Sequence, residues 1–401
     1  MPLGSPLTGV KVLDLSRVLA GPYCASLLAD LGAEVIKVEM PEGGDDSRAF
    51  TPHLGGESTY FMLLNHGKQS LTLNLKHPEG RDLFLRLVEQ ADVVVENFRP
   101  GVTQRLGIDY ATLNAINPRL VYASISGFGQ QGPLAHKAAY DHVIQAMAGI
   151  MQVTGRPEGE PTRVGDAIGD VVAGLYGAWG VLAALLQRGV SGCGQHIDVA
   201  MLDTMMALQM VSLTQWMGGK PSAGRIGNAH PISAPMDSYR ADDGYVVIAV
   251  ANDRLFARLA QALDAVDLPS DPRFATDPQR LAHQNALRER IEHWLCGKTV
   301  AQAVALLDEA GVPAAPVWTL EAALASPHAQ ARQLLKPIKH PTAGDIAIFT
   351  QPVKMSGMAP PTDLQPPTLG QHTRQILTQK LQLSQQELER LQQQGVIGKQ
   401  E

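Results

Sequence analysis

The chain has 401 residues, which is too long for one average domain, so we expect two or three domains. Hydrophobic residues make up 45% and charged residues 18% of the sequence, a composition typical of folded globular proteins rather than disordered ones. The net charge of −6 lacks the basic excess of nucleic-acid-binding proteins, so we expect no nucleic-acid partner.

The first third of the chain alternates short β-rich runs with amphipathic helical runs. Strands are expected at 10–15, 34–39, 70–75, 92–98 and 120–126. The first helix is expected to open at Gly21-Pro22 and to end near Gly32. Strand, helix and strand at this spacing predict an open parallel sheet of an α/β domain, Rossmann-like in topology. Ligands of such sheets bind at the carboxyl ends of the strands.

The rest of the chain changes character twice. Residues 140–218 are expected to be mostly helical around a strand at 194–200, and 236–250 form a hairpin pattern. Further helices are expected at 252–264, 279–296, 299–311, 370–381 and 384–394, with a proline-rich surface connection at 360–367. We therefore expect a large α/β domain at 1–220, a small α+β domain at 225–325, and a segment at 326–401 that returns to the large domain.

Cysteine and histidine placement argues against metal sites and disulfides. Cys24, Cys193 and Cys296 lie far apart, and the scattered histidines form no zinc-binding pattern, so we expect no metal. The first residues lack a secretory signal. The apolar run at 171–187 is short for a membrane span and fits a buried core helix better. We expect a cytoplasmic protein with no membrane partner.

Two common enzyme motifs are missing from the sequence. The first strand–loop–helix has no GxGxxG, so an NAD site is disfavoured although Glu39 could reach a ribose hydroxyl. A GxSxG elbow for serine-based hydrolysis is also missing. Basic residues do fall at the predicted ligand edge, where they could bind a ligand with several phosphates: Arg17, Lys76, Arg99, Arg105 and Lys137.

The stretch RVGDAIGD (163–170) places two aspartates directly before the long apolar run. Aspartate is a preferred N-cap residue, so Asp170 is expected to cap the following helix. A carboxylate at a helix N-terminus is also held rigidly and stays ionised, which suits a nucleophile. Asp166 should lie in a loop, with its side chain directed away from Asp170, because a second nearby charge would raise the pKa of the nucleophile.

Ordered segments over nearly the whole chain together carry a family resemblance. They are VLDLSRVLAGP, GAEVIKVE, NHGKQSLTLNLKHPEG, DVVVENFRPGVTQRLG, SGFGQQGP, YDHVIQAMAGIM, the GD before the apolar run, GQHIDVAMLD, GNAHPISAP and PPTLGQHT. In sequence and spacing the chain resembles the class III CoA-transferases. The resemblance implies a CoA-transferase that binds no permanent cofactor and no metal and uses a coenzyme A thioester as a substrate. It also implies an interlocked homodimer.

By this resemblance Asp170 is the catalytic nucleophile, which forms an acyl anhydride and then an aspartyl-CoA thioester. The residues expected to contact CoA by position, together with the basic Arg17, are Val18, Leu19, Ala20, Leu73, Asn74, Leu75, Lys76, Asn97, Phe98, Arg99 and Arg105. Tyr140 and Lys137 are expected near the reacting acyl group. The expected donor is succinyl-CoA or another short acyl-CoA, and the expected acceptor is a carboxylic or dicarboxylic acid.

Two other functions remain open for this sequence. An α-methylacyl-CoA racemase would share the fold and the CoA site, but it needs a histidine where this chain has Tyr140, and a tyrosine of ordinary pKa is a poor proton-transfer partner. His142 lies two residues later and should point elsewhere on a helix. A non-catalytic CoA-binding protein of the same fold is the second alternative.

Overall fold

The structure is a computed structural model that describes residues 4–358 and 364–398. The chain divides into two compact units. The first comprises Met1–Ala148, Val164–Gln209 and His328–Glu401, and the second Gly149–Arg163 and Met210–Pro327. These bounds differ from the expected ones, because 149–163 and 210–220 belong to the second unit and not to the large domain. Part of the proline-rich stretch expected at 360–367 lies outside the described residues.

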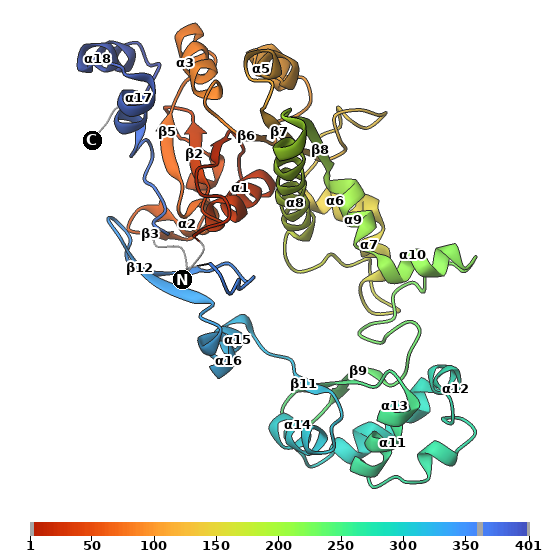
Figure 1. Cartoon of the computed structure of the whole chain (residues 1–401). Helices are drawn as coiled ribbons and strands as arrows, with labels where there is room; N and C mark the ends of the chain where they lie inside the picture. The colour runs from red at the N-terminus through yellow and green to blue at the C-terminus, as the bar shows by residue number, and fades with distance from the viewer. Residues whose placement is uncertain (1–3, 359–363, 399–401) are drawn as a thin grey trace. The chain divides into compact units, whose positions relative to one another are not determined.

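A six-stranded parallel sheet forms the centre of the first unit (Figure 1). Its strand order is β5 (Gln69–Thr72), β2 (Glu34–Glu39), β1 (Lys11–Asp14), β6 (Val93–Glu96), β7 (Val121–Ser126) and β8 (His196–Ala200). All five neighbouring pairs run parallel. The α/β fold with a parallel sheet that the sequence predicts is therefore confirmed. Every strand expected from the sequence in this region is present, with ends shifted by a few residues.

Helices cover the sheet because its central strands are buried at consecutive positions and so bury both faces. One cluster joins the strand side chains Leu13, Ile36, Leu71 and Val94 to apolar residues of four helices. Those helices are α3 (Pro78–Val88), α5 (Tyr110–Ile116), α17 (Thr373–Leu381) and α18 (Gln385–Gln393). The last two helices of the chain thus pack on the core of the first unit.

Glycines let α8 (Ile168–Ser191) approach α1 (Ala20–Asp30) and the sheet closely. A Cβ at Gly174 would lie 2.6 Å from the carbonyl oxygen of Ala20, and one at Gly177 would lie 2.7 Å from the Ile125 side chain. No larger residue fits at either position without displacing backbone or core atoms. The N-terminus of α1 is therefore fixed against the first half of α8.

The apolar run forms a helix that packs on the core of the first unit, as expected, but part of its apolar surface is exposed. α8 is long and apolar enough to cross a membrane by length and composition, a test that core helices of soluble proteins also pass. Its small residues pack inward, but its other face leaves Trp179 67% and Leu186 77% exposed. The helix therefore has one face buried in the first unit and one apolar face uncovered.

The remaining elements of the first unit connect these parts. Its other helices are α2 (Thr59–Asn65), α4 (Val102–Leu106), α6 (Asp141–Ala148), α9 (Met201–Ala207) and α16 (Pro327–Ala331). The first residue of α16, Pro327, belongs to the second unit. Two small antiparallel pairs are formed by β3 (His53–Leu54) with β4 (Glu57–Ser58) and by β12 (Leu335–His340) with β13 (Gly344–Phe349).

The second unit has its own core around a three-stranded antiparallel sheet. The strands are β9 (Met236–Arg240), β10 (Tyr245–Ala249) and β11 (Ala314–Pro316), and β9 and β10 are the predicted hairpin. The helices are α7 (Ile150–Val153), α10 (Met210–Met217), α11 (Asp253–Ala262), α12 (Asp277–Ala282), α13 (Gln284–Leu295), α14 (Val300–Glu309) and α15 (Leu320–Ala325). The single helix expected at 279–296 is two helices, which meet at His283.

Candidate active site

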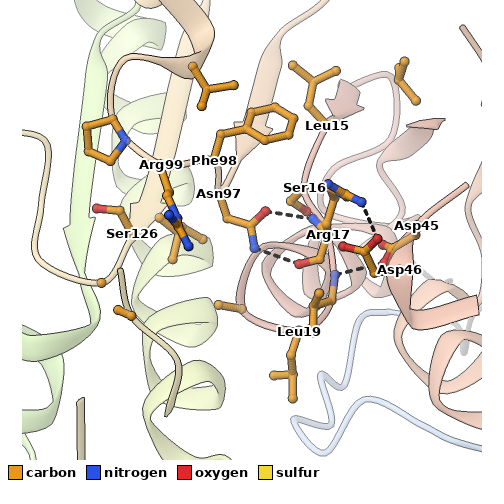
Figure 2. Close-up of a pocket in the computed structure, with 18 of the residues that line it drawn as sticks. Leu15, Ser16, Arg17, Leu19, Asp45, Asp46, Asn97, Phe98, Arg99 and Ser126 are labelled. Atoms are coloured by element: carbon orange, nitrogen blue, oxygen red, sulfur yellow. Dashed lines mark hydrogen bonds and ion pairs between the residues drawn. The ribbon is translucent and has the colours of Figure 1, made fainter. Parts of the chain in front are cut away.

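A cavity of about 620 Å³ opens in the first unit at the carboxyl ends of the parallel strands (Figure 2). The turns after β1, β5 and β6 supply much of its wall, and the first turn of α8 contributes one acidic residue. The predicted site residues that line it are Arg17, Val18, Leu19, Ala20, Leu73, Leu75, Lys76, Asn97, Phe98, Arg99, Lys137, Tyr140 and Asp170. Residues far apart in the sequence thus meet at one edge of the sheet.

Two predicted CoA contacts do not line this cavity. The side-chain oxygen of Asn74 accepts a hydrogen bond from the backbone N–H of Lys76, at 3.1 Å, so Asn74 shapes the turn that carries Lys76. Arg105 lies on α4 with its side chain exposed, close to Gly101. Asn74 therefore acts on the wall indirectly, and Arg105 stands outside it.

Asn97 joins two walls of the cavity through its side-chain amide. Its oxygen accepts a hydrogen bond from the backbone N–H of Arg17 at 2.8 Å, and its nitrogen donates to the carbonyl oxygen of Arg17 at 2.7 Å, as Figure 2 shows. Both ends of the amide bind the backbone of Arg17, so Asn97 positions the loop after β1, and one N–H of its amide is left for a ligand.

We expect Asn97→Ala to raise the apparent KM for the CoA substrate about 10-fold with a smaller change in kcat, because the loss of both hydrogen bonds frees the Arg17 loop. Asn117→Ala is the matched control, since Asn117 also donates to two backbone carbonyls, of Val88 and Ala91, and does not line the cavity. Steady-state kinetics of both variants test this. Equal KM changes in the two would show that general destabilisation is the cause.

The basic residues of the cavity differ in whether they already have a partner within the protein. The Arg17 guanidinium pairs with Asp46, and the Lys137 ammonium lies 3.6 Å from the sulfur of Met147 and 6.0 Å from the ring centre of Phe128. Within residues 4–358 and 364–398, Lys76, Arg99 and Lys137 form no ion pair with an acidic residue. These three side chains are the cations that an anionic ligand meets without displacing a carboxylate.

Glu39 is not available to a nucleotide ribose. Arg48 donates to both carboxylate oxygens of Glu39, at 2.7 and 2.8 Å, and the Ser70 hydroxyl donates at 2.7 Å. The backbone N–H of Asp45 donates a further hydrogen bond, at 3.0 Å. The carboxylate oxygens are thus occupied within the protein, which agrees with the missing glycine fingerprint of an NAD site.

Asp170 lies in the first turn of α8, and the prediction that it is the N-cap is wrong. The helix begins at Ile168 and its N-cap is Ala167, which has no side-chain cap. The helix thus starts two residues before Asp170, where the carboxylate of Asp141 accepts a hydrogen bond from the N–H of Gly169. The carboxyl group still lies at the positive end of a 24-residue helix and lines the cavity.

Burial and the nearby Asp141 carboxylate raise the pKa of Asp170 to about 7. The expectation that the helix end keeps this carboxyl fully ionised is therefore wrong near neutral pH. Asp141 is buried at the start of α6, and its carboxylate accepts hydrogen bonds from the backbone N–H of Gly169 and from the Gln145 side chain, each at 2.7 Å. Asp141 thus holds the beginning of α8 and makes the Asp170 carboxyl more basic.

Asp166 is exposed and bonds within its own loop. Its carboxylate accepts from the backbone N–H of Ala167 at 2.7 Å, and its carbonyl oxygen accepts from the N–H of Ile168 at 2.9 Å. The two aspartates of RVGDAIGD therefore have different surroundings, and Asp141, not Asp166, is the carboxylate that raises the pKa of Asp170.

Sequence reasoning missed two hydroxyl groups near the nucleophile. Tyr60 lies in α2, and burial followed by the charge of Asp170 raises its pKa to about 12. Ser126, at the end of β7, lines the cavity, and its buried hydroxyl has no hydrogen-bond partner among the described residues. No motif marked either residue, because proximity to Asp170 arises only when α2 and β7 meet α8 in the fold.

The cavity lacks the second proton-transfer group that a racemase needs. Of the described residues, no histidine lines it, and His142 is exposed on α6. Tyr140 lines the cavity with its side chain 75% exposed. The other acidic residues of the wall, Glu39, Asp45 and Asp46, are each paired with a basic side chain of the protein. Asp170 has no such ion pair with any residue that the structure describes, which favours a nucleophile over a pair of acid–base groups. Over the same described ranges, no group of three or more His, Cys, Asp or Glu residues could hold a metal ion.

Comparison with known proteins decides the family. The family model described as "CoA-transferase family III" matches residues 7–373. The chain belongs to CoA-transferase family III. It is 44% identical to the acetyl-CoA:oxalate CoA-transferase of Acetobacter aceti, over 89% of this chain and 90% of that protein. It is 40% identical to the succinate–glutarate CoA-transferase of Agrobacterium fabrum, over 93% of this chain and 95% of that protein.

A solved structure supports the same assignment. A CAIB/BAIF family protein from Brucella suis is 40% identical, with a TM-score of 0.84 over 94% of this chain and all of that chain. This member of CoA-transferase family III is therefore an enzyme that uses CoA thioesters as substrates. The resemblance identified in the sequence is confirmed.

Proposed function

We propose that the enzyme transfers CoA from a short acyl-CoA, such as succinyl-CoA, to a dicarboxylic acid through covalent intermediates on Asp170. The single observation that carries the mechanism is the position of Asp170. Its carboxyl group lines the CoA-sized cavity at the start of α8 with a pKa of about 7, so a large share is ionised at neutral pH. Ionised carboxylate is the nucleophilic form.

The proposed steps conserve the thioester bond energy. A carboxylate oxygen of Asp170 attacks the thioester carbonyl, the C–S bond breaks, and CoA leaves as a thiolate while an acyl–aspartyl anhydride forms. The thiolate then attacks the aspartyl carbonyl, which releases the first acid and leaves an aspartyl-CoA thioester. The acceptor carboxylate attacks this thioester, the C–S bond breaks, and CoA leaves as a thiolate while an acceptor–aspartyl anhydride forms. The thiolate finally attacks the acceptor carbonyl of this anhydride, which gives the new acyl-CoA and releases the Asp170 carboxylate. Thioester is exchanged for thioester, so the balance needs no ATP.

The cavity residues suit these steps in separate ways. Lys76 and Arg99 are free to pair with CoA phosphates, and the first-loop residues Arg17 to Ala20 face the same space. The Ser126 hydroxyl is a buried donor of the cavity wall with no partner among the described residues, so it can bind the negative charge that develops on a carbonyl oxygen. Apolar walls exclude water from the anhydride and the thioester, both of which hydrolyse readily.

The substrate pair is proposed from the relatives. The names of these relatives combine acetyl-CoA with oxalate and succinate with glutarate, so short acyl-CoA donors and dicarboxylate acceptors are the first to test. A panel of acetyl-CoA, succinyl-CoA and glutaryl-CoA against oxalate, succinate and glutarate, with products separated by liquid chromatography, should show transfer for at least one pair. Hydrolysis without transfer across the whole panel would contradict the proposed function.

A homodimer, interlocked as the resemblance implies, and a cytoplasmic location remain predictions. The uncovered apolar face of α8, with Trp179 and Leu186 exposed, supports a second copy of this chain as its partner. Light scattering on the purified enzyme should give the mass of two chains. A monomer at micromolar concentration would contradict the expected dimer.

A further inference from the structure

The loop that follows β1 contains a backbone conformation that its residue disfavours. Val18 has φ of 69°, in the left-handed region where a β-branched side chain is strained. Its neighbours Arg17, Leu19 and Ala20 all line the cavity with it. A strained residue persists only where surrounding contacts hold it, so the contacts of this loop determine the shape of this wall.

Two side chains hold the strained loop from opposite sides. Asn97 binds both the N–H and the carbonyl oxygen of Arg17. Asp45 accepts a hydrogen bond from the N–H of Val18 at 3.1 Å, and the same oxygen accepts from the N–H and the hydroxyl of Ser47, each at 2.9 Å. The Asp45 side chain is buried, so its bond to Val18 is shielded from water.

Lys37 connects Asp45 to the start of the loop. Its ammonium lies 2.9 Å from the second carboxylate oxygen of Asp45 and donates to the carbonyl oxygen of Ser16 at 2.8 Å. Burial disfavours ionisation of Asp45, but the charge of Lys37 and the N–H groups of Ser47 and Val18 hold its pKa below the usual range. The Lys37 side chain has no exposed surface. Asp45 thus carries a full negative charge against the loop.

A second buried ion pair fixes the two ends of the same loop. Asp14 accepts hydrogen bonds from the N–H and the hydroxyl of Ser16, and Lys68 donates to Asp14 at 2.8 Å. Lys68 also donates to the carbonyl oxygen of Pro22 in the first turn of α1, at 2.8 Å. The chain is therefore anchored before and after Val18, so that Val18 itself must take up the turn.

We propose that Asp45, charged and oriented by Lys37, is a positioning residue that keeps the loop from Arg17 to Ala20 in the conformation that binds CoA. The inference rests on the proposed function, because it assumes that this cavity binds CoA. Asp45 borders the cavity, but its carboxylate oxygens are bound by Val18, Ser47 and Lys37, so it acts through the Val18 N–H. Its charge is unfavourable to the phosphates of CoA, so its role here must be in shaping the loop.

The direction in which Asp45→Asn changes CoA affinity shows whether Asp45 acts through the shape of the loop or through its charge. If Asp45 affected CoA only through its charge, Asp45→Asn would strengthen CoA binding, because it removes a negative charge beside an anionic ligand. If Asp45 holds the loop, the substitution weakens binding, because the asparagine amide cannot satisfy both the Val18 N–H and the Lys37 ammonium. We expect the Kd for CoA, measured by isothermal titration calorimetry, to rise about 10-fold.

A glycine at position 18 tests whether Asp45 affects CoA binding through the strained conformation of Val18. Glycine adopts φ of about 70° without steric cost. We therefore expect Asp45→Asn to raise the Kd for CoA about 10-fold in the wild-type background, and only about two- to threefold in the Val18→Gly background. The matched control is Asp30→Asn, since Asp30 is another buried carboxylate, paired with His66 at 3.0 Å and outside the cavity wall. It should leave the Kd unchanged.

The titrations distinguish failure of the inference from failure of the proposed function. The role of Asp45 would be overturned if Asp45→Asn bound CoA as tightly as the wild type or more tightly, or if it raised the Kd equally in both backgrounds. Neither result would contradict the proposed function. Failure of the wild-type enzyme to bind CoA would overturn the proposed function and the inference with it. Thermal unfolding of each variant, measured beside its CoA titration, shows whether every protein compared is folded.

Discussion

Asp170→Asn should lower kcat for CoA exchange by about 10⁴-fold, because the amide cannot form the anhydride that begins the reaction. The effect should fall on kcat and not on CoA affinity. Lys76 and Arg99, the cavity cations proposed to bind the CoA phosphates, are unaltered in this variant. Initial rates with the best pair from the donor and acceptor panel, together with calorimetric CoA binding, give both quantities.

The stability of the same variant provides a control with a defined pH dependence. The pKa of Asp170 is raised from 3.8 to about 7 by folding, so ionisation of this carboxyl destabilises the wild-type protein as pH rises between these values. The asparagine variant has no such cost. Its Tm should match that of the wild type near pH 4 and exceed it above pH 7. Full activity of Asp170→Asn, or loss of its fold, would contradict the account.

Asp141→Asn should shift the acidic limb of the pH profile to lower pH. Activity requires ionised Asp170, so kcat/KM of the wild type should rise with pH through about 7. Removing the Asp141 charge lowers the pKa of Asp170, but burial is the larger cause of the raised value, so the limb should stay above the ordinary aspartate range. The asparagine oxygen can still accept the hydrogen bond from Gly169.

Asp166→Asn is the matched control for this pH profile. Asp166 lies four residues before Asp170, is exposed, and is not among the groups that shift the pKa of Asp170. Its replacement should leave the acidic limb in place. If the midpoint of the acidic limb moved equally in both variants, the general charge of this helix end would be the cause. If the midpoint did not move in Asp141→Asn, the role of Asp141 would be refuted.

The parallel sheet could be predicted from the sequence because its signals are local. Runs such as EVIKVE and DVVVENF are β-rich and separated by helical patterns, and each forms the expected strand. Helix ends were less predictable. The N-cap of α8 is Ala167 and not an aspartate, because Asp141 on α6 binds the backbone of Gly169 and replaces the local cap. That contact joins residues 28 positions apart.

The candidate site could be predicted only for residues that follow strands directly. Arg17, Lys76, Asn97 and Arg99 fall at strand ends and do line one cavity. What they do there depends on tertiary partners. The Asn97 amide binds a backbone 80 positions away, and Arg17 pairs with Asp46. Asp141 acts on Asp170, and Asp170 acts on Tyr60, through space, so no spacing in the sequence marked Asp141 or Tyr60.

The central claim is that the Asp170 carboxylate becomes covalently bound during CoA transfer. The most direct measurement incubates the enzyme with succinyl-CoA alone, adds hydroxylamine, and maps the peptides by mass spectrometry. The account predicts a hydroxamate on the peptide that contains Asp170 and none in the Asp170→Asn variant. Sustained CoA transfer by an enzyme whose Asp170 peptide stays unmodified would contradict it.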